Sequence, residues 1–199
     1  MTGDYIQLEG PGYTVGKNCE DVRFTHVPVK NGITSKSLKE IYFSKPGVYQ
    51  VTLSYRPGTG GDVWTGVRLM QGSKSLGHSN GYGQGGGNDP AIATVLFLAE
   101  VTDTKTACRI QLCRLNALQG VANPAPIQGE ALPGFQATIH EVQAPYAQLE
   151  SKRQVFPADS DGTWTGVTFD AAKPMPLGKG IVVKGANIYF ESRGFYQVR

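Results

Sequence analysis

Short runs of alternating hydrophobic and polar residues, each bounded by turn-forming residues, recur along the first 142 residues. The clearest run covers residues 48–55 and places four side chains on one face: Tyr49, Val51, Leu53 and Tyr55. A period of two is typical of β-strands with one buried face. The pattern therefore predicts strands and turns almost throughout this part of the chain.

Six further segments are predicted as strands from similar signals: residues 22–27, 41–43, 63–70, 91–101, 107–115 and 134–142. Residues 91–101 are apolar enough for a helix, but their β-branched residues and flanking turn signals favour a strand. Pro46 and Gly47 occupy the central positions of a predicted type II turn. About eight strands in roughly 140 residues predict an all-β, antiparallel two-sheet jelly-roll sandwich.

The pattern changes after Val142, where an internal repeat begins to show. Residues 1–142 are expected to form one complete jelly roll and residues 143–154 a linker. Features of the first part then recur in the same order: Ile41, Tyr42, Phe43, Gly47 and Tyr49 recur as Ile188, Tyr189, Phe190, Gly194 and Tyr196. Residues 155–199 are predicted as the start of a second, incomplete jelly-roll repeat, either truncated or completed by another chain, because about 45 residues cannot bury such a core.

The amino-acid composition excludes several classes of protein. The 199 residues include 26 Gly and 12 Pro, which excludes a helical bundle. A net charge of +3 is too small to indicate nucleic-acid binding. No apolar run reaches the ~20 residues that a membrane helix needs. The first ten residues show no signal-peptide pattern, so any export is expected to need no leader.

The three cysteines do not suggest a disulfide framework. Cys108 and Cys113 lie five positions apart in one predicted strand and therefore face opposite sides. With Cys19 they make an odd number at irregular spacing. The sequence predicts small buried residues without a disulfide and synthesis in a reducing environment.

Several motifs resemble the jelly-roll heads of the tumour necrosis factor and complement component 1q type. An aromatic strand runs into a Pro-Gly-x-Tyr turn, and a Gly-Phe strand closes the domain. The residues that carry this motif are Tyr42, Phe43, Pro46, Gly47, Tyr49, Gly134 and Phe135. Between them lie a Val-x-Leu strand, residues 67–69, and a hydrophobic hairpin, residues 94–98 and 109–115.

The resemblance implies a homotrimer in which aromatic and aliphatic residues of one sheet pack along a threefold axis. Related trimeric jelly rolls also serve as spikes, fibre heads and capsid decorations of viruses. The chain carries no collagen stalk of the kind found in animal complement proteins. This departure favours the viral branch.

The glycine-dense segment 77–90 is predicted as a surface loop, in which His78, Asn80 and Tyr82 could contact a ligand. Gly81, Gly83 and Gly86 fit a nucleotide-binding spacing, but an apolar strand follows instead of the required helix. A connecting loop without a ligand is the alternative to a binding loop.

No set of residues predicts catalysis, a metal site or a cofactor. His26, His78 and His140 are dispersed, and there is no Gly-x-Ser-x-Gly motif. Residues 159–162 hold two aspartates before a glycine but lack the later acidic residue of a calcium loop, which predicts a plain turn.

These observations predict a non-enzymatic, trimeric structural or attachment protein of a virion, as a capsid decoration, spike or fibre head. Its partners would be two copies of itself and other virion or assembly proteins, without nucleic acid. The alternative is a soluble or secreted recognition module, extracellular, that binds a carbohydrate or a protein such as a surface glycan or receptor.

Overall fold

The computed structural model describes residues 3–11, 19–55, 61–85, 93–114, 135–149, 177–184, 187–194 and 196. The chain divides into two compact units, Met1–Val142 and Gln143–Arg199. All regular elements in the described ranges are β-strands. Over the same ranges, no helix is long and apolar enough to cross a membrane.

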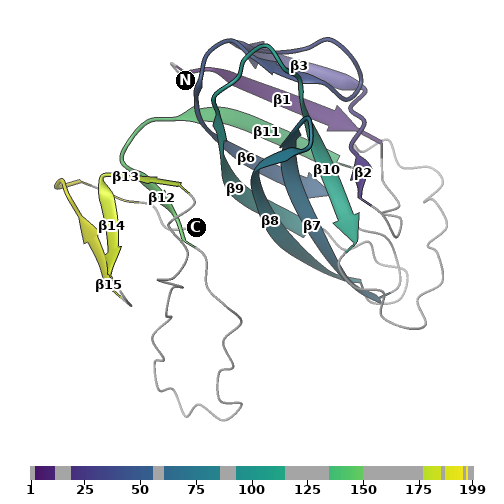
Figure 1. Cartoon of the computed structure of the whole chain (residues 1–199). Coiled ribbons are helices and arrows are strands. Elements are labelled where there is room, and N and C mark those ends of the chain that lie inside the picture. The colour runs from purple at the N-terminus through teal and green to yellow at the C-terminus, as the bar shows by residue number, and fades with distance from the viewer. Residues whose placement is uncertain are drawn as a thin grey trace. The chain divides into compact units, whose positions relative to one another are not determined.

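Unit 1 is a sandwich of two antiparallel sheets (Figure 1). The first sheet has the order β3 (His26–Asn31), β1 (Tyr5–Gly10), β11 (Phe135–Val142), β6 (Gly47–Tyr55) and β9 (Ala93–Val101). The second has the order β4 (Ile33–Ser35), β5 (Ile41–Phe43), β10 (Cys108–Arg114), β7 (Gly61–Gln71) and β8 (Lys74–Gly85), and β2 (Glu20–Asp21) pairs with β10. The predicted all-β jelly-roll sandwich is confirmed by this strand order.

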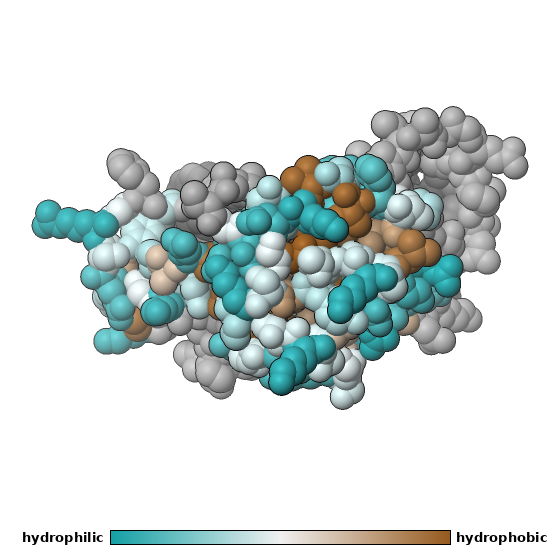
Figure 2. Space-filling model, turned by 90° about the horizontal axis from the view of Figure 1, so that it is seen from above, coloured by the Kyte–Doolittle hydropathy of each residue, from teal (hydrophilic) through white to brown (hydrophobic). Residues whose placement is uncertain are grey.

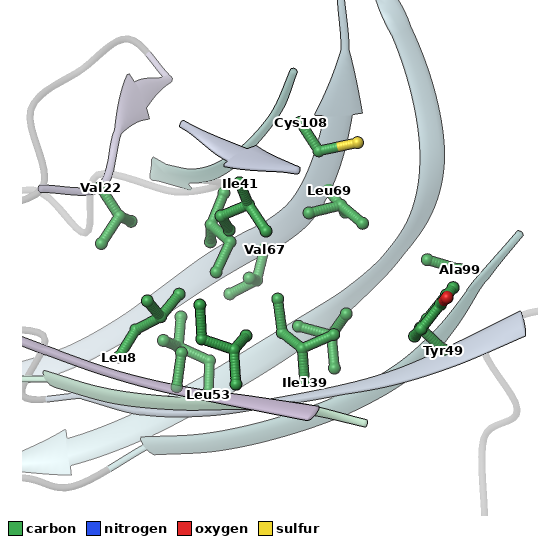
Figure 3. Close-up of a cluster of buried hydrophobic side chains, with 14 of the residues drawn as sticks. Leu8, Val22, Ile41, Tyr49, Leu53, Val67, Leu69, Ala99, Cys108 and Ile139 are labelled. Carbon is green, nitrogen blue, oxygen red and sulfur yellow. The ribbon is translucent and has the colours of Figure 1, made fainter. Parts of the chain in front are cut away.

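Alternation along the strands produces the core between the sheets. In β6 the four predicted apolar residues are all buried. Leu8, Leu53 and Ile139 of the first sheet point toward Ile41 and Val67 of the second (Figure 3). Burial of such side chains stabilises the sandwich by about 1.5–3 kcal/mol for each large aliphatic residue.

The predicted strand at residues 22–27 is wrong in its extent. Val22 and Phe24 are buried, as the pattern requires, but neither lies in a strand. The Val22 amide donates to the Ile110 carbonyl and the Phe24 amide to the Leu38 carbonyl, both at 2.8 Å. The chain crosses here from one sheet to the other, so its backbone bonds have changing partners and form no ladder.

The first part of the predicted glycine-rich loop is a strand. Residues 77–85 belong to β8, which pairs with β7 along its length. A Cβ on Gly77 would collide with the carbonyl oxygen of Leu98, and one on Gly81 would lie 2.6 Å from the Tyr55 hydroxyl. These glycines therefore let β8 approach the first sheet closely, and residues 86–90 lie outside the described ranges.

The bend before β6 is not a type II turn. Such a turn needs a positive φ at Gly47, yet the described glycines with positive φ are Gly32, Gly72 and Gly180. Gly47 instead begins β6. The hydroxyl of Tyr49 donates to the Lys45 carbonyl at 2.9 Å, which fixes the bend from inside.

The expectation that no disulfide forms is also wrong. Cys19 and Cys113 are joined, while Cys108 is a buried free thiol. Strand β2 pairs with β10 at Asp21↔Gln111 and Glu20↔Leu112, so the next position of the same register brings the two cysteines together. Because the two cysteines are 94 positions apart, their local spacing gives no sign of this pairing.

Unit 2 holds two strand pairs in its described residues. Strand β12 (Tyr146–Gln148), which falls inside the predicted linker, pairs with β13 (Leu177–Lys179). Strand β14 (Ile181–Lys184) pairs with β15 (Asn187–Phe190). Residues 150–176, which include the turn predicted at residues 159–162, lie outside the described ranges.

Candidate interaction surfaces

Two of the three residues predicted to contact a ligand share one exposed face of β8. His78 and Asn80 are two positions apart on the strand and both are exposed. Tyr82 follows on the same strand, but its side chain is outside the described part of the structure. An edge strand rather than a loop therefore presents His78 and Asn80.

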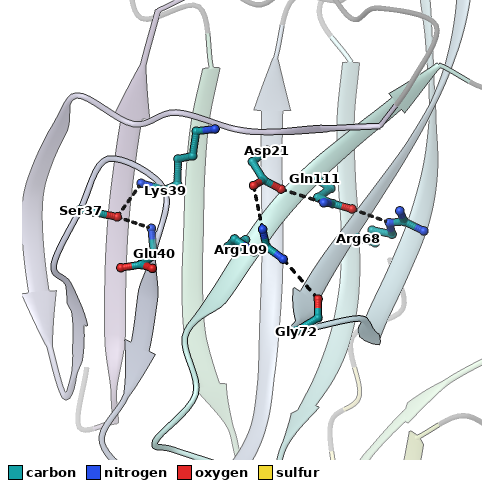
Figure 4. Close-up of polar contacts among 8 residues, drawn as sticks. All are labelled: Asp21, Ser37, Lys39, Glu40, Arg68, Gly72, Arg109 and Gln111. Atoms are coloured by element: carbon teal, nitrogen blue, oxygen red, sulfur yellow. Dashed lines mark hydrogen bonds and ion pairs between the residues drawn. The ribbon is translucent and has the colours of Figure 1, made fainter.

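A band of polar side chains crosses the outer face of the second sheet beside them. We call Asp21, Arg109, Gln111 and Arg68 the polar band (Figure 4). Gln111 Nε2 donates to Asp21 Oδ1 at 2.7 Å, and Arg68 Nε donates to Gln111 Oε1 at 3.0 Å. Arg109 forms an ion pair with Asp21 at 3.0 Å and also donates to the Gly72 carbonyl at 3.2 Å.

Strand register places the polar band next to the predicted ligand residues. Arg68 lies opposite His78 on β8, and Asn80 lies opposite Gly66, which has no side chain. Side chains held by such hydrogen bonds form a preorganised surface that could bind polar ligands. Sequence reasoning missed the band because its members come from three strands that are distant in the chain.

The outer face of the first sheet has a different composition. On β1, β11, β6 and β9 it carries two acidic residues, Glu9 and Glu100, which lie near opposite ends, and no lysine or arginine. The rest of this face is uncharged or histidine: Tyr5, Gln7, Gln136, Thr138, His140, Val142, Val48, Gln50, Thr52, Ser54, Thr94, Leu96 and Leu98.

Polar groups on this face bind one another. Ser54 and Thr94 share a hydrogen bond of 3.0 Å, and Gln50 Nε2 donates to Thr52 Oγ1 at 3.4 Å. Because these groups already have protein partners, the cost of removing them from water is reduced. The aromatic residues of β6 point into the core, whereas Tyr5 of β1 and several aliphatic residues lie on this outer face.

The motif residues near β5 and β6 form a packed corner. The rings of Phe43 and Tyr49 are 4.5 Å apart, and both residues are buried. Burial, and then the charges of Asp4 and Glu141, raise the pKa of Tyr49 well above its usual value. Tyr42 points outward, with the Lys36 ammonium 4.7 Å from its ring centre.

The remaining motif residues have separate positions. Phe135 is buried against Gly10, whose Cβ, if present, would collide with the Phe135 ring. Pro46 is exposed in the bend. Gly134 lies outside the described ranges. The motif therefore supports packing inside the sandwich and gives no indication of a ligand site.

A cluster of charged and polar side chains connects Asp4, just before β1, with the bend that precedes β6. Ser44 Oγ donates to Asp4 Oδ2 at 2.6 Å, and the Lys45 ammonium lies 2.9 Å from Glu141 Oε2. The hydrogen bond from Lys45 lowers the pKa of Glu141.

Across the described ranges, no group of three or more His, Cys, Asp or Glu side chains could hold a metal ion.

Comparison with known proteins returns structures but no sequence relatives. No protein-family model matches the chain. No curated protein matches it either. A crystal structure of murine APRIL matches with a TM-score of 0.45 and 9% identity, covering 71% of this chain and all of that one.

Two other matches come from an animal and a virus. The globular domain of a zebrafish complement 1qA protein matches with a TM-score of 0.44 and 11% identity, over 69% of this chain and 94% of that one. The vertex protein P5 of PRD1 matches with a TM-score of 0.43 and 18% identity, over 71% of this chain and 98% of that one. At identities of 9–18%, these likenesses concern the fold alone.

Proposed function

We propose that the chain is a non-enzymatic structural or attachment protein that assembles as a homotrimer in a virion. The observation that carries this proposal is the difference between the two outer faces of unit 1. On β1, β11, β6 and β9 the outer face of the first sheet carries two acidic residues and no basic residue, and some of its polar side chains bond to one another. The outer face of the second sheet carries the polar band. A low-charge sheet face suits burial between copies of the chain, and a charged face suits contact with water or a ligand.

The sequence motifs support the same arrangement. They resemble those of trimeric heads in which one sheet faces the other copies. Hydrophobic residues gather on part of the surface seen from above, among hydrophilic ones (Figure 2). The large apolar residues exposed in unit 1 are Val29 and Leu38 within the described ranges. Residues of this kind are available for contacts with other assembly proteins.

Quantitative mass spectrometry of purified virus particles tests the virion role. The proposal expects the chain in a fixed ratio to the capsid proteins, resistant to washing with salt. Its absence from particles that are otherwise intact would overturn the virion role, whether or not the chain is a trimer in solution.

A recognition module is the second candidate, and the exposed pair His78 and Asn80 beside the polar band favours it. Binding of the purified chain to an array of surface glycans tests this function. Specific binding should be lost in His78→Ala and Asn80→Ala and retained in the control Ser75→Ala, which changes an exposed residue nearer the start of β8. Binding that survives both substitutions would remove this surface as the site.

A further inference from the structure

A row of four polar side chains crosses the second sheet from β2 to β8. Asp21 lies opposite Gln111, and Gln111 lies opposite Arg68 on its other side. Arg68 in turn lies opposite His78. Residues directly opposed on antiparallel strands have Cβ atoms about 4.5–5.5 Å apart on the same face. Leu112, next to Gln111, is buried in the core, so the row lies on the outer face of the sheet.

The charges along this row leave Arg68 without a counter-ion. Asp21 forms its ion pair with Arg109, two positions before Gln111 on β10, at 3.0 Å. Among the acidic side chains that the structure describes, none forms an ion pair with Arg68. One positive charge on this part of the face is therefore available to an anionic ligand.

The Arg68 guanidinium is oriented by one of its three nitrogen atoms. Its Nε donates to Gln111 Oε1 at 3.0 Å, and Gln111 is fixed in turn by its bond of 2.7 Å to Asp21 (Figure 4). Within the described ranges, the two Nη atoms have no hydrogen-bond partner. Their N–H groups form a planar fork that matches the two oxygens of a carboxylate. The side chain is half-buried, which limits its alternative positions.

The adjacent row on this face contains a position without a side chain. Gly66 precedes Arg68 by two residues on β7 and lies between Cys113 of β10 and Asn80 of β8. The disulfide holds Cys113, and Asn80 is exposed. A glycine within a strand allows a ligand to approach the backbone closely. A group bound to Arg68 can therefore also reach the Asn80 amide across Gly66.

The side chains around Gly66 favour a sugar over a protein surface. The amides of Asn80 and Gln111 both donate and accept hydrogen bonds, as sugar hydroxyls do. The centre of a protein–protein interface is usually apolar. In the two rows described here, no outward-facing residue has a large aliphatic side chain.

We propose that Arg68, with Gln111, His78 and Asn80 around it, binds the carboxylate of an acidic sugar such as a uronic acid. The Nη atoms of Arg68 donate to the two carboxylate oxygens, and Asn80 exchanges hydrogen bonds with hydroxyls of the same ring. The single charge of Arg68 matches the single charge of a uronic acid. This inference rests on the recognition function, the second candidate above, and adds the chemical class of its ligand.

Titration of the isotope-labelled full chain with methyl glucuronoside, followed by NMR, tests the carboxylate. Methyl glucoside, which carries a neutral hydroxymethyl group in its place, is the matched control at equal ionic strength. The glucuronoside should shift the Arg68 Nε–H resonance saturably and bind at least about tenfold more tightly, because hydrogen bonds to a charged group are lost with the glucoside. Equal binding of the two sugars would overturn the proposal.

Variants of Arg68 assign the preference to its side chain. Arg68→Gln should abolish the preference for the glucuronoside. Arg68→Lys keeps the charge without the planar fork and should retain only part of the preference. Lys74→Gln, which removes an exposed positive charge elsewhere on β8, should bind as the unmodified chain does. An unchanged preference in Arg68→Gln, with the resonances of other residues in place, would overturn the assignment.

Two further probes separate the carboxylate of a sugar from other anionic ligands. Equally tight binding of a glucose sulfate ester would overturn the carboxylate as the recognised group. Equally tight binding of a short glutamate-containing peptide would overturn the sugar and indicate a protein partner.

The glycan array distinguishes this inference from the recognition function on which it rests. Binding of neutral glycans that depends on His78 and Asn80, without a preference for the glucuronoside, would overturn the acidic ligand and leave the recognition function standing. Absence of binding to glycans of any charge would overturn both.

Discussion

Cys19 and Cys113 lie opposite each other across the β2–β10 pair, with their Cα atoms 4.0 Å apart, and a disulfide joins them. The bond closes a loop between residues 94 positions apart and holds the segment before β2 to the second sheet. Asp21, two residues after Cys19, then meets Arg109 and Gln111. The disulfide and the polar band therefore both hold β2 against β10.

Removal of the disulfide should destabilise unit 1. In the double variant Cys19→Ser and Cys113→Ser, the free energy of unfolding should fall by about 2–4 kcal/mol, because the unfolded chain regains the freedom of a long loop. Denaturant unfolding measures the change. Cys108→Ala, which leaves the disulfide in place, is the control for loss of a cysteine. Equal midpoints with and without a reductant in the unmodified chain would contradict the assignment.

Stability should decline in alkaline solution. Burial raises the pKa of the Cys108 thiol from 9.0 to about 12, and burial also raises the pKa values of Tyr49 and Tyr55. The folded state then holds these protons more tightly than the unfolded state does. Their contribution is complete below about pH 9 and is lost as the pH rises toward the folded-state values.

Denaturant unfolding at about pH 8 and about pH 10.5 checks this dependence. The free energy of unfolding should be lower at the higher pH. Cys108→Ala should reduce the difference because one of the three groups is removed. A free energy that is the same at both values would show that these groups titrate alike in the folded and unfolded chains.

The glycines of β8 should not tolerate a side chain. Gly77→Ala places a methyl group against the Leu98 backbone, which cannot move aside as a side chain can, and should cost about 1–3 kcal/mol. Gly47→Ala is the matched control: its Cβ would lie 3.5 Å from the Tyr49 ring, an ordinary contact, and should change stability by about 0.5 kcal/mol or less. Thermal unfolding of both variants compares them. Equal tolerance at the two sites would contradict the close approach of β8.

Two buried tyrosines should respond in opposite ways to loss of the hydroxyl. Tyr49→Phe removes the bond to the Lys45 carbonyl and should lower the free energy of unfolding by about 1 kcal/mol. The hydroxyl of Tyr55 is buried and has no hydrogen-bond partner among the residues that the structure describes, so Tyr55→Phe should leave stability unchanged or raise it. Denaturant titrations of the two variants measure the difference. A larger loss for Tyr55→Phe would show that its hydroxyl has a partner.

Much of unit 1 could be predicted from the sequence because its strands alternate with a clear period of two. Residues 48–55 fall within one strand, with the four apolar side chains buried as expected. The alternation of apolar and polar residues is less informative where contacts between distant segments determine the backbone conformation. Val22 and Phe24 alternate with polar residues as in a strand and are buried, although their backbone crosses between the sheets.

The candidate surfaces were harder to predict than the core. Local composition made residues 77–85 look like a loop, since the need for glycine arises from β9 and β6, which are distant in the chain. Likewise, Arg68 and Asp21 come together only through their pairing with β10. A search for polar residues at alternate positions of neighbouring strands would have found the band, but only with the strand order known.

The native mass of the purified chain tests the proposed assembly most directly. A homotrimer would have a mass of about 64 kDa, three times 21.4 kDa. Thr52→Lys places a charge at the centre of the low-charge face and should shift the mass toward that of the monomer, whereas Asn80→Lys on the other outer face should leave it unchanged. A mass of 21.4 kDa for the unmodified chain at all concentrations would contradict the trimer.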